Sequence, residues 1–239
     1  MFSYIWHTIF FDPIYNTLIF FVDTIRLHDV GLAVIATVIV VKVILLPIAL
    51  KASRTNQLMK KVQPEIKAIQ DKYKGKREEL ALHLMEVYKR EKLNPFSPLL
   101  ILIIQIPVLF ALYFSVTSLP DIKSELLYTF VPSPETINML FLGTIAMDAR
   151  HMGLALLAGI TMHLLARVTL PPKTEKKEGE KPDFMQDMQD SMRTMMLYVM
   201  PVVIVVFGYT FAAVISLYFT ISNLTSIVQE LYVRKKIAV

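Results

Sequence analysis

One ionisable side chain, Lys42, lies in the middle of the apolar segment GLAVIATVIVVKVILLPIAL at residues 31–50. Twenty helical residues rise about 30 Å, which matches one bilayer core, so we expect Lys42 near the membrane midplane. A cation at that depth costs about 3 kcal/mol on insertion scales. A charge kept at such a cost is typical of a functional position inside the bilayer, where it can attract acidic or polar groups.

Sparse polar residues accompany Lys42 in the apolar segments, and each alone is more typical of a hydrogen bond between helices than of a site. Lys42 differs because no acidic residue is expected at its depth; Glu230, the only one in a predicted span, should lie near the cytosolic surface. An unpaired ammonium group needs water, and the lysine stem, about 6 Å long, cannot reach across half of the core. A wet cavity is therefore predicted around Lys42. The candidate residues that line it are Thr37, Gln105, Thr161, Thr220, Ser222 and Asn223.

Catalytic and metal-binding motifs are missing from the sequence. There is no Gly-x-Ser-x-Gly motif, no His-Glu-x-x-His motif and no P-loop, and the predicted spans contain no aspartate. The absence of cysteine excludes disulfides, thiolate metal sites and thiol catalysis. His163 is the only histidine well inside a predicted span, and we expect it to pack against another helix rather than bind a metal. We therefore predict no enzyme, no cofactor and no metal.

Hydropathy and charge define the segments that must hold these residues. Hydrophobic residues make up 54% of the chain and the mean hydropathy is +0.51, which is typical of a membrane protein. Residues 51–95 hold 12 of the 25 lysines and arginines, against 6 acidic residues. Because basic loops stay in the cytosol, this asymmetry places residues 51–95 there. Aromatic residues are largely in the apolar segments, so the basic tract does not indicate nucleic-acid specificity.

Five transmembrane helices are predicted, so the expected fold class is an all-α membrane protein. Residues 194–233 would extend about 60 Å as one helix, twice a bilayer core, and are therefore divided into two spans with Gly208 near the turn. With residues 51–95 in the cytosol, five spans place the N-terminus outside and the C-terminus in the cytosol. The predicted spans are residues 31–50, 96–118, 152–170, 194–210 and 211–233.

Residues 1–30 are predicted to form an extracytoplasmic interfacial helix. One helical face is apolar and the other polar, a pattern that suits a helix lying on the outer leaflet. The apolar face is Ile14, Leu18, Phe21, Val22 and Ile25, and the polar face is Asn16, Thr17, Asp23 and Thr24. A cleaved signal peptide is the alternative, although a basic start and a small-residue cleavage site are missing.

Residues 51–95 are predicted to form a cytosolic helical hairpin, because apolar residues recur at helical spacing on both sides of Gly75. Pro64 is expected in a first helical turn that separates the hairpin from the first span. The other connections are an extracytoplasmic loop at 119–151, a cytosolic loop at 171–193 and a cytosolic tail at 234–239.

Methionines recur along one predicted helical face just before the fourth span. They indicate either an amphipathic entry into the membrane or a soft surface that contacts varied apolar chains, because methionine repacks easily. The second interpretation makes Met185, Met188 and Met192 contact residues, followed on the same face by Met195 and Met196.

Five short patterns occur in order along the chain. They are GLAVIATVIVVKVILLP at 31–47, VQPEIK at 62–67, YKREKLNPF at 88–96, LIIQIPVLFALY at 102–113 and SLYFTISNL at 216–224. Together, from about residue 13 onward, they resemble the YidC family of membrane protein insertases. Their order, spacing and number carry the resemblance, since no single pattern is specific.

The resemblance implies a five-helix core with a hydrophilic groove that opens to the cytosol and to lipid. A charged residue of the first core helix, typically arginine, points into that groove; Lys42 stands at this position, so the charge is kept but the bidentate fork of arginine is lost. The resemblance also implies client capture by the 51–95 hairpin and client contact at Tyr218. The implied partners are nascent membrane protein chains and the lipid bilayer, with the ribosome and the Sec translocon as further candidates. The implied location is the bacterial cytoplasmic membrane.

The sequence departs from the family pattern in other places. Residues 208–211 stand where many relatives carry a Pro-Ser-Gly turn. The tail at 234–239 is short, whereas long basic tails bind the ribosome in some relatives, so we expect any ribosome contact here to be weak or to use the loops. The sequence has no counterpart of the large extracytoplasmic domain of many Gram-negative relatives.

The expected function is therefore a membrane protein insertase or chaperone that moves nascent hydrophobic segments into the bilayer without nucleotide hydrolysis. The first alternative is a small transporter or channel with Lys42 as the binding charge for an anionic solute. The single intramembrane charge and the lack of a repeated half with broken helices disfavour it. The second alternative is an assembly factor that only holds other membrane subunits together.

Overall fold

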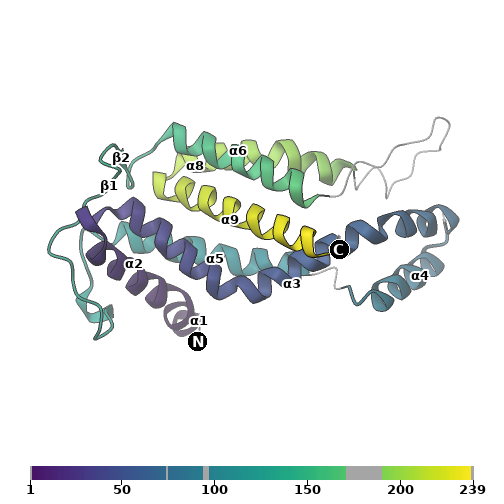
Figure 1. Cartoon of the computed structure of the whole chain (residues 1–239), viewed down its shortest axis with the longest axis horizontal. Helices are drawn as coiled ribbons and strands as arrows, with labels where there is room; N and C mark the ends of the chain where they lie inside the picture. The colour runs from purple at the N-terminus through teal and green to yellow at the C-terminus, as the bar shows by residue number, and fades with distance from the viewer. Residues whose placement is uncertain (1, 74, 94–96, 171–189, 238–239) are drawn as a thin grey trace.

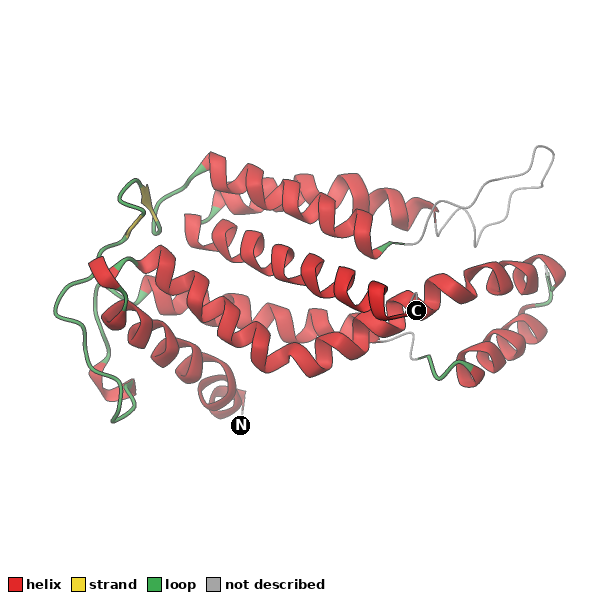
Figure 2. Ribbon diagram, viewed as in Figure 1, coloured by secondary structure: helices red, strands yellow, loops and turns green. Residues whose placement is uncertain are grey.

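The computed structural model describes residues 2–73, 75–93, 97–170 and 190–237, and these are mostly helical (Figures 1 and 2). The helices are α1 (Phe2–Ile5), α2 (Asp12–Thr24), α3 (Val30–Lys72), α4 (Arg77–Arg90), α5 (Ser97–Thr117), α6 (Met152–Thr169), α8 (Met200–Thr210) and α9 (Ala213–Ile237). Two π-helical turns, η1 (Trp6–Phe11) and η4 (Met195–Val199), and two 3-10 turns, η2 (Arg26–His28) and η3 (Ser124–Leu126), complete them. The predicted all-α class is confirmed.

Helix α9 lies in the middle of the bundle, between the α3–α5 layer and the α6–α8 layer (Figure 1). Four helices are long and apolar enough to cross a membrane, and Ile103–Thr117 is a shorter apolar helix within the described residues. The four are Ser3–Thr24, Val30–Lys72, Met152–Thr169 and Asp190–Thr210. α9 is not among them because polar residues such as Asn223 and Gln229 make it less apolar. Ser3–Thr24 lies within residues 1–30, predicted as an interfacial helix, and the placement of that helix on the outer leaflet stays a prediction.

Helix α3 runs without interruption from the bundle into a projecting hairpin (Figure 1). The predicted break at Pro64 is wrong, since both Pro47 and Pro64 lie inside the helix. A proline inside a helix removes one backbone hydrogen bond and bends the helix, but flanking turns can continue it. With 43 residues, α3 is about 65 Å long, twice a bilayer core, so one end must project beyond the membrane.

The projecting hairpin consists of the end of α3 and the antiparallel helix α4. The chain reverses at Gly75, whose φ of +86° is a conformation that glycine adopts without steric cost. A small apolar core of Val62, Ile66, Val87 and Leu93 joins the two helices. Arg90 also donates to Glu65 on α3 at 2.5 Å, but both side chains are exposed, so packing contributes more than this ion pair.

The turn between α8 and α9 lies at residues 211–212, not at Gly208 as the sequence suggests. Gly208 is helical, and its missing side chain serves close packing: a Cβ there would lie 2.4 Å from Ser216 Oγ. The Ser216 hydroxyl donates to the Gly208 carbonyl at 3.0 Å. A glycine in an apolar run therefore marks helix contact here rather than a turn.

Helix α2 is hydrogen-bonded to the segment at 119–151. Asn16, predicted on the polar face, is buried; its amide donates to Leu126 O at 2.9 Å and its oxygen accepts from Tyr128 N at 2.7 Å. Tyr15 is also buried, and its hydroxyl accepts from Lys123 N at 3.0 Å. The polar face of α2 thus binds protein rather than water at this position.

The same segment, predicted only as a loop, contains a two-stranded antiparallel sheet, β1 (Leu140–Phe141) and β2 (Ile145–Ala146). The backbone just beyond β2 covers the start of α9: Ala213 N donates to Ala149 O at 2.7 Å, and Val214 N donates to Met147 O at 3.1 Å. The first N–H groups of a helix have no partner within it, so this segment satisfies donors that would otherwise be orphaned.

We expect Asp29→Ala to destabilise the protein by about 1–3 kcal/mol, because it removes the N-cap of α3 and a second buried acceptor. Asp29 is buried and accepts from Leu32 N at 3.0 Å and from Leu142 N at 2.7 Å. Thermal unfolding in detergent measures the effect. Asp29→Asn, which keeps one acceptor oxygen, should lose less, and Asp121→Ala at an exposed position should lose almost nothing. Equal midpoints for Asp29→Ala and Asp121→Ala would contradict the prediction.

Candidate functional site

Lys42 lies on α3 and reaches α9, where its ammonium group donates to Ser226 Oγ at 3.3 Å. Ser226 in turn donates to Ser222 O at 2.8 Å. Lys42 is half-buried, and no ion pair in the described part of the chain includes it. Among the described residues, its charge therefore has a neutral hydroxyl as partner and no acidic one, and the wet cavity around it stays a prediction.

Gln105 joins α5 to the same part of α9. Its amide donates to Ser222 Oγ at 3.0 Å and to the Tyr218 hydroxyl. The Ser222 hydroxyl thus accepts from Gln105, and the Ser222 carbonyl accepts from Ser226. Through Ser222, Gln105 of α5 is linked to Ser226, the partner of Lys42 on α3. We call Lys42, Gln105, Tyr218, Ser222 and Ser226 the α9 polar network.

The other predicted lining residues lie elsewhere. Asn223 points to α6, where its amide donates to Thr161 Oγ1 at 3.2 Å and to Ala158 O at 3.4 Å. Thr37 and Thr220 are buried, and each donates to a carbonyl four residues earlier in its own helix. Thr161, Asn223, Thr37 and Thr220 are thus bonded within the packed helices, and only Gln105 and Ser222 share a network with Lys42.

A second polar group, which the sequence does not predict, joins α3 to the far end of α9. Gln57 donates to Glu230 Oε1 at 2.5 Å, and this carboxylate is only 3% exposed. Gln229 donates to Ser53 Oγ at 2.8 Å beside it. Lys60 donates to Val168 O at 2.6 Å and so links α3 to the end of α6 as well. The helical spacing of Ser53, Gln57 and Lys60 is the only sequence signal for this cluster.

The predicted client-contact residues differ in exposure. Tyr218 is 1% exposed and bonded to Gln105, so its ring is covered in this arrangement. Met192 is 55% exposed. Met185 and Met188 lie outside the described residues. Client contact at all four positions stays a prediction.

Apolar side chains close in sequence to members of the α9 polar network are exposed. Val43, which follows Lys42, is 61% exposed; Ile103, two residues before Gln105, is 59% exposed; and Val228, two residues after Ser226, is 68% exposed. Side chains of this kind suit hydrocarbon or the apolar segment of another chain.

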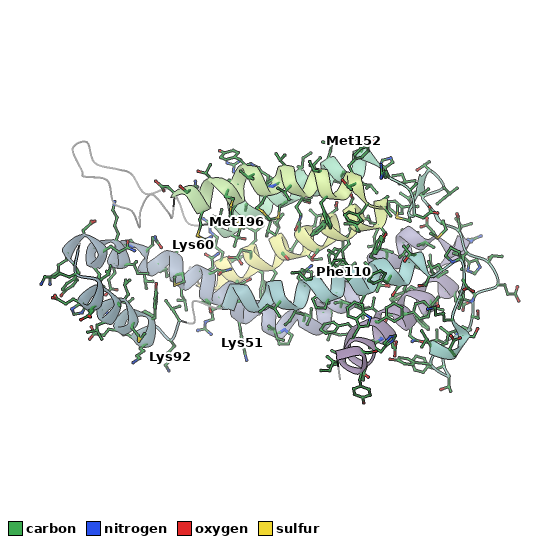
Figure 3. All side chains as sticks on the ribbon, turned by 180° about the vertical axis from the view of Figure 1, so that it is seen from behind. Lys51, Lys60, Lys92, Phe110, Met152 and Met196 are labelled. Carbon is green, nitrogen blue, oxygen red and sulfur yellow. The ribbon has the colours of Figure 1, made fainter. Side chains whose placement is uncertain are left out.

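In Figure 3 the labelled basic residues Lys51, Lys60 and Lys92 lie toward the hairpin end of the molecule.

Residues 20–238 match the family described as 60Kd inner membrane protein. This match covers most of the chain. The chain belongs to the 60Kd inner membrane protein family.

Relatives of this chain in the 60Kd inner membrane protein family carry the name "Membrane protein insertase YidC". The protein of Clostridium perfringens is 30% identical over 227 residues, 93% of this chain and 87% of the relative. The protein of Syntrophobacter fumaroxidans is 30% identical over 98% of this chain, and that of Helicobacter pylori strain 26695 is 31% identical over 86%. The chain spans 39% and 33% of the length of these last two relatives.

Each histidine of this family member has a hydrogen-bond partner within the described ranges. No group of three or more His, Asp or Glu residues there could hold a metal ion. His163 Nδ1 donates to Leu197 O at 2.7 Å, so it packs against another helix as the sequence predicts.

We expect Gln57→Leu to lower the free energy of unfolding by about 2–3 kcal/mol, because it leaves the buried Glu230 carboxylate without its donor. Replacing both partners in Gln57→Leu/Glu230→Leu should recover most of this loss. Unfolding in detergent with increasing denaturant measures both. The matched control is Gln229→Leu, which removes a bond to the neutral Ser53 hydroxyl and should cost about 1 kcal/mol. A Gln57→Leu loss no larger than that of Gln229→Leu would contradict the prediction.

Proposed function

We propose that this protein is a membrane protein insertase and chaperone that moves nascent hydrophobic segments into the bilayer through a hydrophilic groove. The observation that carries the proposal is the half-buried Lys42 ammonium, bonded to a serine hydroxyl rather than to an acid. A cation in an apolar helix that lacks a protein counter-charge is available to attract an acidic or polar group from another chain. The name of its relatives, membrane protein insertase YidC, supports the same function.

The proposed groove contains the Lys42 side of the α9 polar network and opens to the cytosol and to lipid. The polar end of a client enters from the cytosol, and Lys42 attracts it. The apolar segment of the client meanwhile slides along exposed side chains such as Val43 and Val228. Its transfer into lipid contributes about 0.8 kcal/mol per buried CH₂ group, so the reaction needs no nucleotide. The groove lowers the barrier because it shortens the dry path for the polar end.

The proposed topology is that of a bacterial cytoplasmic membrane protein with the N-terminus outside and the hairpin and C-terminus in the cytosol. The hairpin then stands where chains emerge from synthesis, and its 12 basic residues at 51–95 fit the positive-inside rule. We propose nascent membrane protein chains and the lipid bilayer as partners, with the ribosome and the Sec translocon as neighbours of the hairpin.

Lys42→Arg should preserve insertion, whereas Lys42→Ala and Lys42→Glu should impair clients that carry acidic translocated tails. Two unit charges about 8 Å apart at an effective dielectric constant of about 20 attract each other by about 2 kcal/mol, so we expect about a tenfold or larger loss of rate. Insertion of such a client into liposomes, read by protease protection of its tail, measures the rate. The control is Lys51→Ala, an exposed lysine farther along the same helix, which should leave the rate unchanged. Full activity of Lys42→Glu would refute the electrostatic step.

A photocrosslinking residue at position 42, and another in the hairpin at the exposed Leu82, should both react with stalled nascent membrane proteins. An assembly factor that acts only on finished subunits gives no such product during synthesis, and a transporter gives solute flux in liposomes instead. The control position is Tyr128, in the segment predicted on the outer side. Equal crosslinking from positions 82 and 128 to short nascent chains would contradict the proposed entry from the cytosol.

A further inference from the structure

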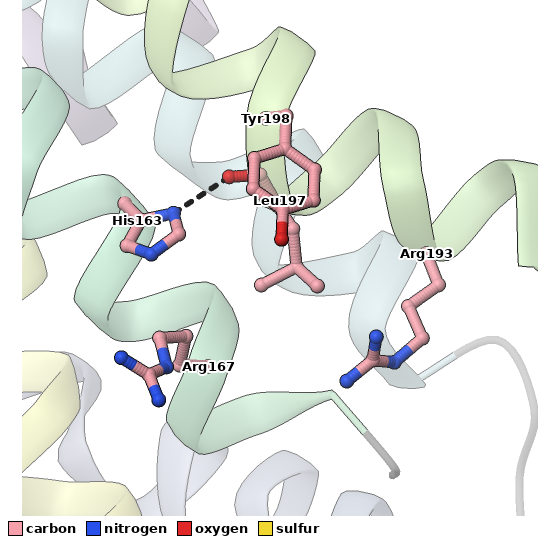
Figure 4. Close-up of a pocket in the computed structure, with 5 residues that line it drawn as sticks. All are labelled: His163, Arg167, Arg193, Leu197 and Tyr198. Carbon is pink, nitrogen blue, oxygen red and sulfur yellow. Dashed lines mark hydrogen bonds between the residues drawn. The ribbon is translucent and has the colours of Figure 1, made fainter. Parts of the chain in front are cut away.

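An open pocket of about 540 Å³ lies between α6 and the residues that lead into α8 (Figure 4). Its lining is His163, Arg167, Arg193, Leu197 and Tyr198. The two guanidinium groups come from opposite sides: Arg167 from the last turn of α6, and Arg193 from the helical residues before η4 (Figure 4). Among the residues that the structure describes, the lining contains no acidic side chain. The pocket does not include any residue of the α9 polar network.

A hydrogen bond between His163 of α6 and Leu197 of η4 joins the two sides of this pocket. Pro201 has no N–H, so the carbonyl of Leu197, four residues earlier, has no α-helical donor. The backbone is π-helical at Met195–Val199, and His163 Nδ1 donates to the free Leu197 carbonyl at 2.7 Å. Because a carbonyl only accepts, Nδ1 carries the proton and Nε2 of the ring is left for other contacts. The bond thus fixes α6 and η4 on either side of the pocket.

Arg167 is available to a ligand. Its side chain is exposed, and it has no hydrogen-bond or ion-pair partner in the described part of the chain. Arg193 brings a second guanidinium and Tyr198 brings a hydroxyl into the same lining. A guanidinium binds phosphate oxygens through two parallel N–H bonds, so this set of donors suits a phosphate ester better than a single carboxylate.

The position of the pocket along the bundle matches the membrane surface. α6 has 18 residues and is about 27 Å long, close to one bilayer core, and Arg167 lies in its last turn. Lys60 of the projecting helix α3 donates to Val168 O at 2.6 Å, so this is the hairpin end of α6. With α6 spanning the bilayer, we expect the phosphates of the leaflet on that side at the depth of Arg167.

Apolar side chains on the two elements that form the pocket are also exposed. Ile160 and Leu164 on α6 are 56% and 44% exposed, and Val199 in η4 is 50% exposed. A ligand with a phosphate head and an acyl tail fits this combination, whereas a free phosphate uses only the cationic part.

We propose that this pocket binds the headgroup of an anionic phospholipid from the leaflet on the hairpin side. The phosphate lies between Arg167 and Arg193, the Tyr198 hydroxyl donates to it, and the acyl chains lie along Ile160, Leu164 and Val199. The proposal does not depend on the insertase function, because it concerns a different face of the protein.

The test uses the full chain in nanodiscs with equal amounts of phosphatidylglycerol and phosphatidylethanolamine. Native mass spectrometry of the released protein counts the lipids that it retains. We expect the wild type to retain phosphatidylglycerol preferentially and Arg167→Gln/Arg193→Gln to lose this preference about tenfold. The matched control is Arg234→Gln, an exposed arginine in the last turn of α9, which should keep the preference. Unfolding midpoints of all variants confirm that they are folded.

A second measurement uses only the wild type. Spin-labelled phosphatidylglycerol should show a larger immobilised fraction than spin-labelled phosphatidylcholine, and excess inorganic phosphate should not abolish the difference. Equal immobilised fractions would overturn the proposal, as would an equal loss of preference in Arg167→Gln/Arg193→Gln and Arg234→Gln. Displacement by inorganic phosphate alone would identify a soluble phosphate as the ligand and also overturn it.

Discussion

The arrangement of this bundle depends on the burial of α9 among four other helices. A polar side chain inside a membrane protein must find its hydrogen bonds within the protein, because lipid offers none. α9 meets this constraint with a different partner on each side: Gln105 of α5 for Ser222, Thr161 of α6 for Asn223, and Gln57 of α3 for Glu230. These bonds set the rotation of α9, and its rotation in turn sets which residue Lys42 meets.

At two depths along the contact between α3 and α9, a charged side chain is bonded to a neutral one. Near the middle, the cation Lys42 has a neutral partner, Ser226. Toward the hairpin, the buried anion Glu230 has a neutral partner, Gln57. The cation and the anion are held apart rather than paired, although both lie on the same pair of helices. A Lys–Glu pair would neutralise the intramembrane cation, whereas their separation leaves Lys42 without a counter-charge, as the proposed function requires.

The two cationic sites of the protein also face different surroundings. Lys42 lies in the α9 polar network inside the bundle, whereas Arg167 lies at the end of α6 on a surface formed with η4. His163 and the proline-disrupted backbone at Leu197 hold that surface in place. The proposed client path and the proposed lipid site are thus compatible, because α6 separates the pocket from the centre of the bundle.

Hydropathy alone was sufficient for the helical class and the approximate helix positions, because burial in lipid imposes long apolar runs. Proline and glycine were misleading as boundaries: Pro64 continues a helix and Gly208 packs against Ser216, and each depends on neighbours that local sequence does not specify. The partners of the polar residues were likewise undetermined. A single sequence gives the spacing along each helix but not its rotation about its axis. Only the packing of α3, α5 and α6 around α9 decided that Gln105 joins the Lys42 network while Thr161 and Asn223 bond each other.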